Sequence, residues 1–409
     1  MKILIVTQYF WPENFRVNDL CVELQERGHN VTVLTGKPNY PDGKIFSDFK
    51  NSPEKYSNYK GIDVVRAPLI ARGKSKIKLI GNYFSFAFLA SVFGPIKLTG
   101  RKFDVIFVYE PSPVTVGLPA ISLKYIKKAP VIFWALDLWP ETLEAIGVVR
   151  SKRILKYIGL LVSFIYNRCD LLLAQSRSFI GCMQRYCKAE NKIHYFPSWA
   201  EDTFSNTETS NAKEVPEANS EMFSVMFAGN MGDAQDFPAI LDAAETLKNH
   251  KNIRWLIVGD GRVANWVRQE CQRREIEENV LLLGSYPIEK MPSFYNSADA
   301  LLVSLKNEDV FNMTIPGKVQ SYLASAKPII GMLNGEGANV ILESGAGYVD
   351  NAGDSTALVE NVLKMEKLSV QERQSLGQSG RNYYEKEFDK IKLIDRLESL
   401  LLSSAQDKI

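Results

Sequence analysis

Short apolar runs without polar alternation recur along the chain and alternate with longer stretches of helical periodicity. Runs of this kind suit strands that are buried on both faces, as in parallel sheets covered by helices. A first series of such runs occupies residues 3–6, 31–34, 105–108, 131–134 and 171–174. A second series occupies residues 225–228, 255–258, 280–283, 300–303 and 329–330, and helical stretches such as 238–249 and 262–274 lie between its members. The two series predict two doubly wound α/β units.

A polar stretch separates the two series. Residues 200–221, AEDTFSNTETSNAKEVPEANSE, contain few large apolar side chains, which indicates an exposed linker. The expected domains are therefore 1–200 and 222–380, joined by a linker over 201–221. After Gly380 an amphipathic pattern predicts a helix within 381–409 that packs back on the first domain.

Composition narrows the class of protein without naming it. The chain has 409 residues, 45% of them hydrophobic, so a large core is available. A net charge of only +2 argues against bulk nucleic-acid binding, which needs a basic surplus. The five cysteines include no CxxC pair, so we expect neither a disulfide framework nor a zinc site, and a reducing cytoplasm is the default.

The stretch MTIPGKVQSYLASAKPII, residues 313–330, places Pro316, Gly317 and Lys318 where a short amphipathic helix is predicted to begin. The first N–H groups of a helix lack partners and the peptide dipoles align behind them, so helix starts attract anions. A lysine beside such a start indicates phosphate binding, with Gln320 one turn further on. The alternative is a proline helix start with a solvated lysine.

Two glycine-rich turns follow predicted strands of the second series. VGDGRVA, residues 258–264, fits G-x-G-x-x-A, but the next strand ends in Gly284 and Ser285 rather than in a carboxylate that could hold a ribose. That absence argues against a nicotinamide or flavin enzyme. In FAGNMGDAQDF, residues 227–237, Gly229 and Gly232 allow close approach of a ligand to the backbone; a plain turn is the alternative.

Polar residues follow strands of the first series at the edge where open α/β sheets bind ligands. WALDLWPE, residues 134–141, supplies Asp137 and Glu141, although Asp137 could instead cap the following helix. YFWPENFRVND supplies Glu13, Asn14 and Arg16 as candidates for binding a polar acceptor. The sequence has no Asp-x-Asp pair, no G-x-S-x-G elbow and no P-loop, which disfavours metal-clamp transferases, α/β-hydrolases and P-loop NTPases.

Taken together, these motifs resemble those of GT-B glycosyltransferases of family 4. The resemblance runs from MKILIVTQYFWPENFRVNDL through WALDLWPE, FAGNMG, VGDG and PGKVQSYLASAKPII to ESGAGYVDN, nearly the whole chain. It implies an α/β GT-B fold with two Rossmann-like domains facing across a cleft. It also implies a retaining transfer from a nucleotide sugar, with UDP as the expected nucleotide and with neither a cofactor nor an essential metal. The second domain would hold the donor and the first domain the acceptor.

The resemblance assigns site residues in three groups. The catalytic candidates are Asp137, Glu141 and Asn312. The donor-binding candidates are Gly229, Asn230, Gly232, Gly259, Tyr286, Pro316, Gly317, Lys318 and Gln320. The acceptor-binding candidates are Glu13, Asn14, Arg16 and Glu110, and no residue is assigned to a metal. Lys318 would contact the diphosphate and stabilise its developing charge.

The sequence departs from the family pattern at two places. The family has two carboxylates eight residues apart where this chain has Asn312 and Gln320, and Gln320 can still hydrogen-bond ribose hydroxyls. The family also has Arg and Lys where this chain has Asn230 and Gln235. Neutralising the diphosphate must then depend on Lys318 and backbone amides, with Lys306 as a further candidate.

The nearest subgroup resembles bacterial transferases of surface-polysaccharide assembly, such as lipopolysaccharide O-antigen or capsule, and within it N-acetyl-L-fucosaminyl transferases. The expected acceptor is a saccharide linked to a polyprenyl diphosphate lipid. Two rivals remain open. One is a nucleotide-sugar 2-epimerase of the same fold, and the other is a non-catalytic nucleotide-sugar-binding protein.

Two unusually apolar stretches bear on location. Residues 79–96 carry no charge and follow Arg72, Lys74, Lys76 and Lys78; residues 157–166 are similar and also have basic flanks. Core helices, interfacial helices facing anionic lipid and a membrane span are all compatible with this pattern. We expect a cytoplasmic protein that lies peripherally on the inner face of the cytoplasmic membrane.

Overall fold

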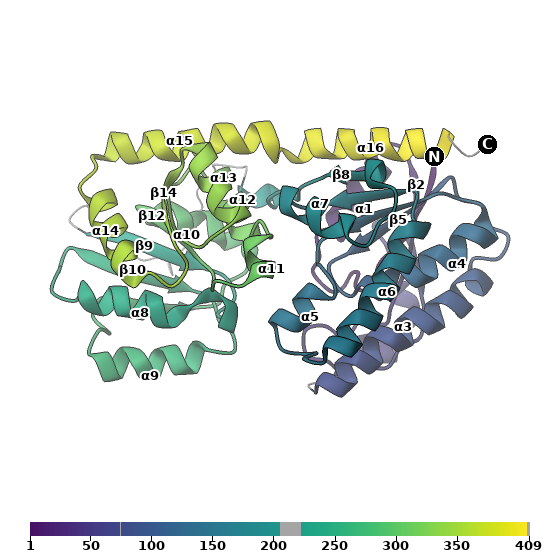
Figure 1. Ribbon diagram of the computed structural model, residues 1–409, viewed down its shortest axis with the longest axis horizontal. Coiled ribbons are helices and arrows are strands. Elements are labelled where there is room, and N and C mark those ends of the chain that lie inside the picture. Colours follow the sequence, from purple (N-terminus) through teal and green to yellow (C-terminus); the bar gives the residue numbers. More distant parts are fainter. Residues whose placement is uncertain (74, 205–221, 407–409) are drawn as a thin grey trace. The chain divides into compact units, whose positions relative to one another are not determined.

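The computed structural model describes residues 1–73, 75–204 and 222–406, which fall into two compact units (Figure 1). Unit 1 comprises Met1–Pro197 with Ile391–Ile409, and unit 2 comprises Ser198–Lys390. Each unit is an α/β structure built on a parallel sheet, so the predicted fold class is confirmed. Most of the expected linker, residues 205–221, lies outside the described residues.

The sheet of unit 1 has eight strands in the order β3-β4-β2-β1-β5-β6-β7-β8, and every pairing is parallel except that of β3 with β4. The strands are β1 (Lys2–Val6), β2 (Asn30–Thr35), β3 (Asn58–Tyr59), β4 (Ile62–Arg66), β5 (Val105–Glu110), β6 (Val131–Ala135), β7 (Leu171–Ala174) and β8 (Ile193–Tyr195). The central strands β1, β5 and β6 are buried along almost their whole length, because helices cover both faces of the sheet.

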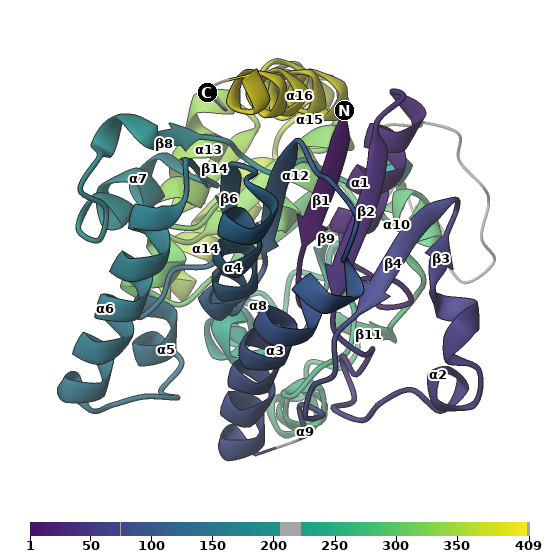
Figure 2. The same cartoon turned by 90° about the vertical axis from the view of Figure 1, so that its right-hand side faces the viewer.

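The helices of unit 1 are α1 (Val17–Glu26), α2 (Ser47–Asn51), α3 (Lys76–Lys97), α4 (Gly117–Lys127), α5 (Glu141–Ala145), α6 (Lys152–Arg168), α7 (Arg177–Gln184) and α16 (Lys390–Gln406). Helix α4 contacts both α3 and α6, so these three helices form one layer (Figure 2). The last helix, α16, is held to unit 1 by polar contacts. Arg27 pairs with Asp395 and Glu398, and the Nε2 atom of His29 lies 2.8 Å from the Oε1 atom of Glu398.

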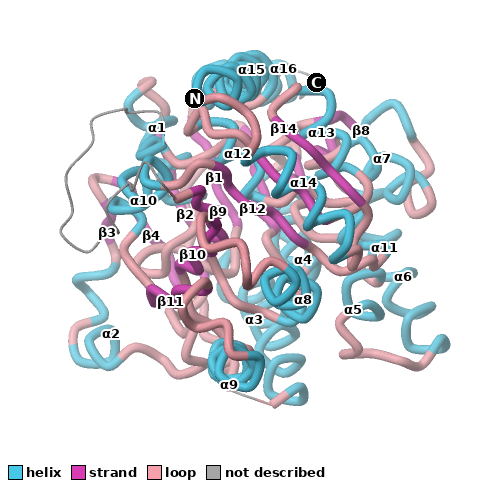
Figure 3. The backbone as a smooth tube through the Cα atoms, turned by 90° about the vertical axis from the view of Figure 1, so that its left-hand side faces the viewer, coloured by secondary structure: helices cyan, strands magenta, loops and turns pink. Residues whose placement is uncertain are grey.

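The sheet of unit 2 has six parallel strands in the order β11-β10-β9-β12-β13-β14. They are β9 (Phe223–Ala228), β10 (Ile253–Val258), β11 (Val280–Gly284), β12 (Ala300–Ser304), β13 (Ile329–Met332) and β14 (Gly347–Asp350). The helices are α8 (Phe237–Thr246), α9 (Ala264–Arg274), α10 (Met291–Ser297), α11 (Asp309–Asn312), α12 (Gly317–Ala324), α13 (Glu336–Ser344), α14 (Ser355–Glu366) and α15 (Val370–Glu387). Two apolar clusters cover its faces, one with α8, α9 and α14 and the other with α10, α12, α13 and α15 (Figure 3).

All ten strands predicted from apolar runs are present. The strands that the runs did not indicate are β3, β4, β8 and β14, which are short or lie towards a sheet edge. Only part of each of these strands is buried, so their sequences lack a continuous apolar run. The pattern therefore detects all the fully covered strands and misses most of the partly buried ones, with the edge strand β11 as an exception.

The C-terminal segment differs from the single helix expected after Gly380. Helix α15 already runs from Val370 to Glu387 and belongs to unit 2, and α16 begins at Lys390. The two helices are separated by Phe388, which has a non-helical backbone and is fully buried in the core of unit 2. Burial of this one aromatic side chain accompanies the break in an otherwise continuous amphipathic pattern.

Candidate functional site

Both sheets have a point at which the strand order reverses. In unit 1 it lies between β1 and β5, and in unit 2 between β9 and β12. Open α/β sheets bind ligands outside the carboxyl ends of the strands at such points, where loops diverge to opposite faces. The loops after these four strands are therefore the first places to look for a site in each unit.

In unit 2 the two glycine turns lie against each other at this edge. The amide of Gly229 donates to the carbonyl of Val258 at 2.8 Å, and that of Met231 donates to Asp260 at 2.9 Å. Gly259 has a φ of +148°, and a Cβ atom there would lie 1.9 Å from the carbonyl oxygen of Gly229. Only glycine fits, because the neighbouring loop occupies the space. The role assigned to Gly259 in donor binding stays a prediction, and the structure gives it a packing role.

Lys318 is the candidate that the structure makes most distinctive. It stands at the second residue of α12, and its Nζ atom lies 3.8 Å from the ring centre of Phe227. Among the described residues it has no hydrogen-bond or ion-pair partner, and burial lowers the pKa of its ammonium group to about 7. A desolvated cation beside the start of a helix suits an anionic ligand.

Gln320 is more buried than we expected of a ribose-binding residue, since its exposed fraction is 2%. Its Nε2 atom donates to the carbonyl of Ser198 at 2.7 Å, and its Oε1 atom is buried without a hydrogen-bond partner. The amide therefore fastens the first residue of unit 2 to α12. One acceptor atom remains unused, and ribose binding by Gln320 stays a prediction.

The other donor candidates lie around Lys318 at the same edge or on neighbouring loops. Asn230 is exposed directly after Gly229, and the amide of Gly232 donates to the Oε1 atom of Gln235 at 3.4 Å. The ring of Tyr286 lies 4.6 Å from that of Phe294 and is partly exposed. Pro316 and Gly317 form the start of α12, where no side chain caps the helix.

Asn312 ends α11, a single helical turn. Its Nδ2 atom donates to the Oδ1 atom of Asn307 at 2.9 Å, and its carbonyl oxygen approaches Gly335 so closely that a Cβ atom there would lie at 1.9 Å. Asn312 is thus held within its own loop. An amide cannot supply the negative charge of a carboxylate, so any catalytic role for it would rest on hydrogen bonding.

In unit 1, Asp137 at the carboxyl edge accepts hydrogen bonds from protein donors through both of its carboxylate oxygens. The Oδ1 atom of Asp137 accepts from the backbone amide of Leu138 and from the hydroxyl of Thr142, and its Oδ2 atom accepts from the indole of Trp139. Burial raises the pKa of Asp137 above its usual value, while these donors oppose that rise. The N-cap of α5 is Pro140 and no side chain caps this helix, so the capping alternative for Asp137 is wrong. Its catalytic assignment stays a prediction.

Two acceptor candidates need correction. Glu13 is 2% exposed and Glu110 is fully buried, so neither presents a carboxylate to a ligand at the surface of unit 1. Glu13 accepts from the amides of Asn39, Tyr40 and Phe10, and burial raises its pKa to about 7. The sequence placed these acids at the correct edge, but hydrogen bonding to loops turned them inward.

The remaining candidates of unit 1 are spread along the edge. Asn14 is exposed, and Arg16 is partly exposed just before α1. Glu141 begins α5, and its Oε1 atom accepts from the hydroxyl of Tyr186 at 2.8 Å. Its other oxygen is buried without a hydrogen-bond partner. Glu141 therefore ties α5 to the segment after α7, whatever further role it has.

Sequence reasoning missed Arg72 as a site residue. Its guanidinium lies 5.1 Å from the ring centre of Tyr40. Burial raises the pKa values of the Tyr9 and Tyr83 hydroxyls, and the charge of Arg72 opposes that rise. The guanidinium has no hydrogen-bond or ion-pair partner within the described part of the chain, whereas that of Arg66 donates to three backbone carbonyls. No local motif marks Arg72, because its neighbours come from three other segments.

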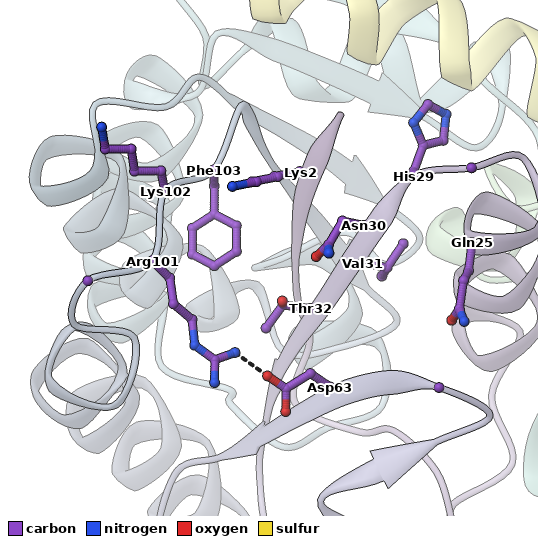
Figure 4. Close-up of a pocket in the computed structure, with 13 residues that line it drawn as sticks. Lys2, Gln25, His29, Asn30, Val31, Thr32, Asp63, Arg101, Lys102 and Phe103 are labelled. Carbon is purple, nitrogen blue, oxygen red and sulfur yellow. Dashed lines mark hydrogen bonds and ion pairs between the residues drawn. The ribbon is translucent and has the colours of Figure 1, made fainter.

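Pockets at the opposite edge of the sheets are less suited to chemistry. Figure 4 shows a pocket of about 760 Å³ in unit 1, at the amino ends of β1 and β2, where Arg101 pairs with Asp63. A second pocket, of about 490 Å³, lies beside Lys327 in unit 2, and the amine of Lys327 already donates to two carbonyls. Arg101, Asp63 and Lys327 have protein partners there, whereas Lys318 has none among the described residues. Among the described residues no three His, Cys, Asp or Glu side chains are grouped to hold a metal ion.

Comparisons with known proteins match both units to glycosyltransferase domains. Residues 14–199 match the family described as glycosyl transferase 4-like domain, and residues 223–367 match glycosyl transferases group 1. The chain is a GT-B glycosyltransferase. The two matches follow one another along the chain without overlapping, so this transferase carries one domain of each kind.

Individual relatives agree with this assignment. The transferase is 24% identical over 343 residues to a putative colanic acid biosynthesis glycosyl transferase, WcaI, of Escherichia coli K12, covering 79% of this chain and 81% of the relative. The structure of Anabaena HepE in complex with UDP and glucose is similar, with a TM-score of 0.69 at 15% identity over 98% of this chain and 100% of that one. The structure of WaaG, a glycosyltransferase involved in lipopolysaccharide biosynthesis, has a TM-score of 0.67 at 12% identity and covers 98% of this chain and 99% of that one. These structural similarities show the fold.

Proposed function

We propose that this glycosyltransferase moves a sugar from a UDP-sugar to a lipid-linked saccharide during assembly of a bacterial surface polysaccharide. The transfer retains the anomeric configuration and needs no essential metal. The acceptor is a saccharide on a polyprenyl diphosphate, and the protein works in the cytoplasm at the inner face of the cytoplasmic membrane. N-acetyl-L-fucosamine is the specific sugar that we propose to test first.

The observation that carries the proposal is the state of Lys318. An ammonium group on a partly exposed residue, desolvated enough to lower its pKa and with no acidic partner among the described residues, lies at the start of a helix and suits the diphosphate of a nucleotide sugar. In the transfer, the bond from the anomeric carbon to the β-phosphate oxygen breaks and its electron pair goes to the diphosphate. The acceptor hydroxyl forms the new bond to the anomeric carbon, and its proton passes to the departing diphosphate. Lys318 would stabilise the charge that develops on the diphosphate.

Two relatives support the finer parts of the proposal. HepE was solved with UDP and with UDP-glucose, which favours uridine as the base. WcaI is named for colanic acid, a polysaccharide, and it aligns with four fifths of the present chain. The epimerase alternative needs a carboxylate or histidine cluster, and two acids at the edge of unit 1, Glu13 and Asp137, already accept hydrogen bonds from protein donors.

The proposal is tested by measuring UDP release and product formation with purified protein. We expect a UDP-sugar to raise the melting temperature, and UDP to be released only when a lipid-linked saccharide is added. Release without acceptor, accompanied by an epimerised sugar, would identify the 2-epimerase. Binding of UDP-sugars without turnover on any lipid-linked saccharide would identify a binding protein.

A further inference from the structure

Unit 1 exposes much apolar surface on two helices. Of the 21 large apolar side chains that are exposed among the described residues, eleven lie on α3 and α6, which have 22 and 17 residues. They are Ile77, Ile80, Phe84, Phe88, Val92, Phe93 and Ile96 on α3, and Ile154, Tyr157, Leu160 and Phe164 on α6. Scattered exposed apolar residues are ordinary, but a contiguous set marks an interaction surface.

The exposed residues recur at steps of three or four along each helix, so they form one stripe on one side. The opposite sides face the core. Helix α3 buries Tyr83 and Phe86 there, and α6 buries Val162 and Ile165. The stripes are therefore surplus to the packing of unit 1, and core helices alone do not explain them.

The charges on both helices have one sign. Helix α3 carries three lysines and α6 carries two lysines and two arginines, and neither helix contains an acidic residue. The basic residues cluster towards the N-terminal ends of the helices, where Lys76, Lys78, Lys152, Arg153 and Lys156 are all exposed. Lys74, which the sequence adds to this group, lies outside the described residues. Cations beside an apolar stripe match an anionic lipid surface.

The two stripes belong to one region of unit 1. Helices α3 and α6 share a layer with α4, and Figures 1 and 2 show both extending from the same side of the sheet. The Nζ atom of Lys76 donates to the carbonyl of Gly147 at 2.7 Å, which ties the start of α3 to the turn before α6. Ile146, in that turn, is also half exposed. The apolar stripes of both helices and their basic residues can thus contact one surface together.

Helix α3 is long and apolar enough to cross a membrane by length and composition. Its polar anchors indicate a different placement. Asn82 is fully buried, receives the amide of Gln8 on its Oδ1 atom at 2.6 Å and donates to the carbonyl of Ile70 at 2.6 Å. Insertion across a bilayer would break these bonds and strip one layer from the sheet. The structure therefore favours α3 lying along a surface.

We propose that the exposed stripes and basic residues of α3 and α6, together the α3–α6 surface, are the part of this chain that docks on an anionic bilayer. The proposal deepens the proposed function, on which it rests for the presence of a lipid-linked acceptor. A second copy of the chain is a poorer occupant, because an isologous contact would bring two sets of seven cations together. A bilayer supplies both anionic headgroups and an apolar interior.

The test is co-sedimentation of the purified protein with vesicles of phosphatidylcholine, with and without phosphatidylglycerol. Phe84→Ser, Phe88→Ser and Tyr157→Ser combined should lower partitioning at least about tenfold, because each side chain loses apolar contact with lipid. The matched control combines Trp266→Ser, Leu342→Ser and Leu402→Ser, which are exposed elsewhere on the chain and should leave partitioning unchanged. Melting temperatures of both triple variants verify the fold.

A second variant tests the charges separately. Lys152→Glu, Arg153→Glu and Lys156→Glu combined should abolish the preference for phosphatidylglycerol, and added salt should reduce wild-type binding. The proposal is overturned if wild-type protein stays in the supernatant or if the stripe variant binds like the control. A stripe variant that instead loses a concentration-dependent dimer would assign the surface to a second copy.

Activity separates this proposal from the proposed function. With the acceptor dispersed in detergent, the stripe variant should release UDP at the wild-type rate, and with the acceptor in vesicles its rate should fall at least about tenfold. Equal rates on vesicles would refute the docking surface and leave the transferase intact. A wild-type protein that is inactive in both settings would refute the proposed function, while the sedimentation result would still decide the surface.

Discussion

At the carboxyl edge of unit 1 the acids Glu13 and Asp137 accept hydrogen bonds from protein donors, whereas at the same edge of unit 2 Lys318 has no hydrogen-bond or ion-pair partner among the described residues. Glu13 accepts hydrogen bonds from three backbone amides, and Asp137 accepts them from an amide, a hydroxyl and an indole. Lys318 contacts the face of Phe227. A group that is satisfied by the protein shapes a loop, and a desolvated group that is not satisfied favours a ligand. The comparison favours unit 2 as the unit that binds the anionic part of the donor.

The largest expected effect tests the unit 2 half of this comparison, the role of Lys318. Lys318→Ala should lower turnover by at least about tenfold, and by about a hundredfold if it acts like other groups that stabilise developing oxyanion charge. The fold should survive, since the change removes a desolvated amine. Lys364→Ala is the matched control, because its Nζ atom also lies 3.8 Å from an aromatic ring centre, that of Tyr348, yet the residue is exposed on α14. Steady-state rates decide, and full activity of a folded Lys318→Ala protein would end the diphosphate role.

The next effect tests whether Glu13 is structural. Burial raises its pKa to about 7, so its contribution to stability is complete below the unfolded pKa near 4.3 and is lost as the pH rises through 7. The free energy of unfolding should fall by about 2–3 kcal/mol across that window relative to Glu13→Gln, which cannot ionise. Urea titrations at about pH 4.5, 6 and 8, which run from near the lower end of this pH window to about one unit above its upper end, measure the free energy of unfolding. Parallel pH profiles of the two proteins would contradict the buried-acid interpretation.

A third prediction sharpens the account of Lys318 through pH. Its pKa of about 7 in the free protein means that the ammonium form is present below pH 7 and is lost above it. Because a bound diphosphate favours that form, the apparent dissociation constant for UDP should rise by up to about tenfold per pH unit above 7. Calorimetry in two buffers of different ionisation enthalpy should detect proton uptake. Lys318→Arg stays charged and should bind without this dependence; a flat wild-type profile from pH 6 to 9 (about two units on the basic side) would contradict the prediction.

The smallest effect concerns Gln320. The family pattern predicts that Gln320→Glu is tolerated in catalysis, yet the Nε2 atom donates to the carbonyl of Ser198 at 2.7 Å. A carboxylate would face that carbonyl, so we expect a loss of about 1–2 kcal/mol in stability at pH 8. The loss should shrink at acidic pH, where a protonated glutamate can donate again. Unchanged stability at both pH values would show that Ser198 is not held by this side chain.

The segment PGKVQS shows how much of the candidate site a local sequence pattern can predict. A helix start with a lysine could be recognised from Pro316, Gly317 and Lys318 alone, and the structure places that helix at the predicted residues. What the pattern could not show is that Lys318 is desolvated or that Gln320 is fastened to Ser198, 122 residues away. Burial and long-range hydrogen bonds depend on segments that are distant in sequence.

By itself the sequence determined the two parallel α/β units, because strands covered on both faces must be written as continuous apolar runs. It also determined the edge at which the candidate residues gather, since that follows from strand direction. Only the tertiary structure decided which of those residues face inward. Glu13 and Asp137 accept hydrogen bonds that neighbouring segments donate, whereas no described segment places an acidic partner beside Arg72 or Lys318. The same holds for α3 and α6, whose apolar stripes became surface because the sheet needs only one side of each helix.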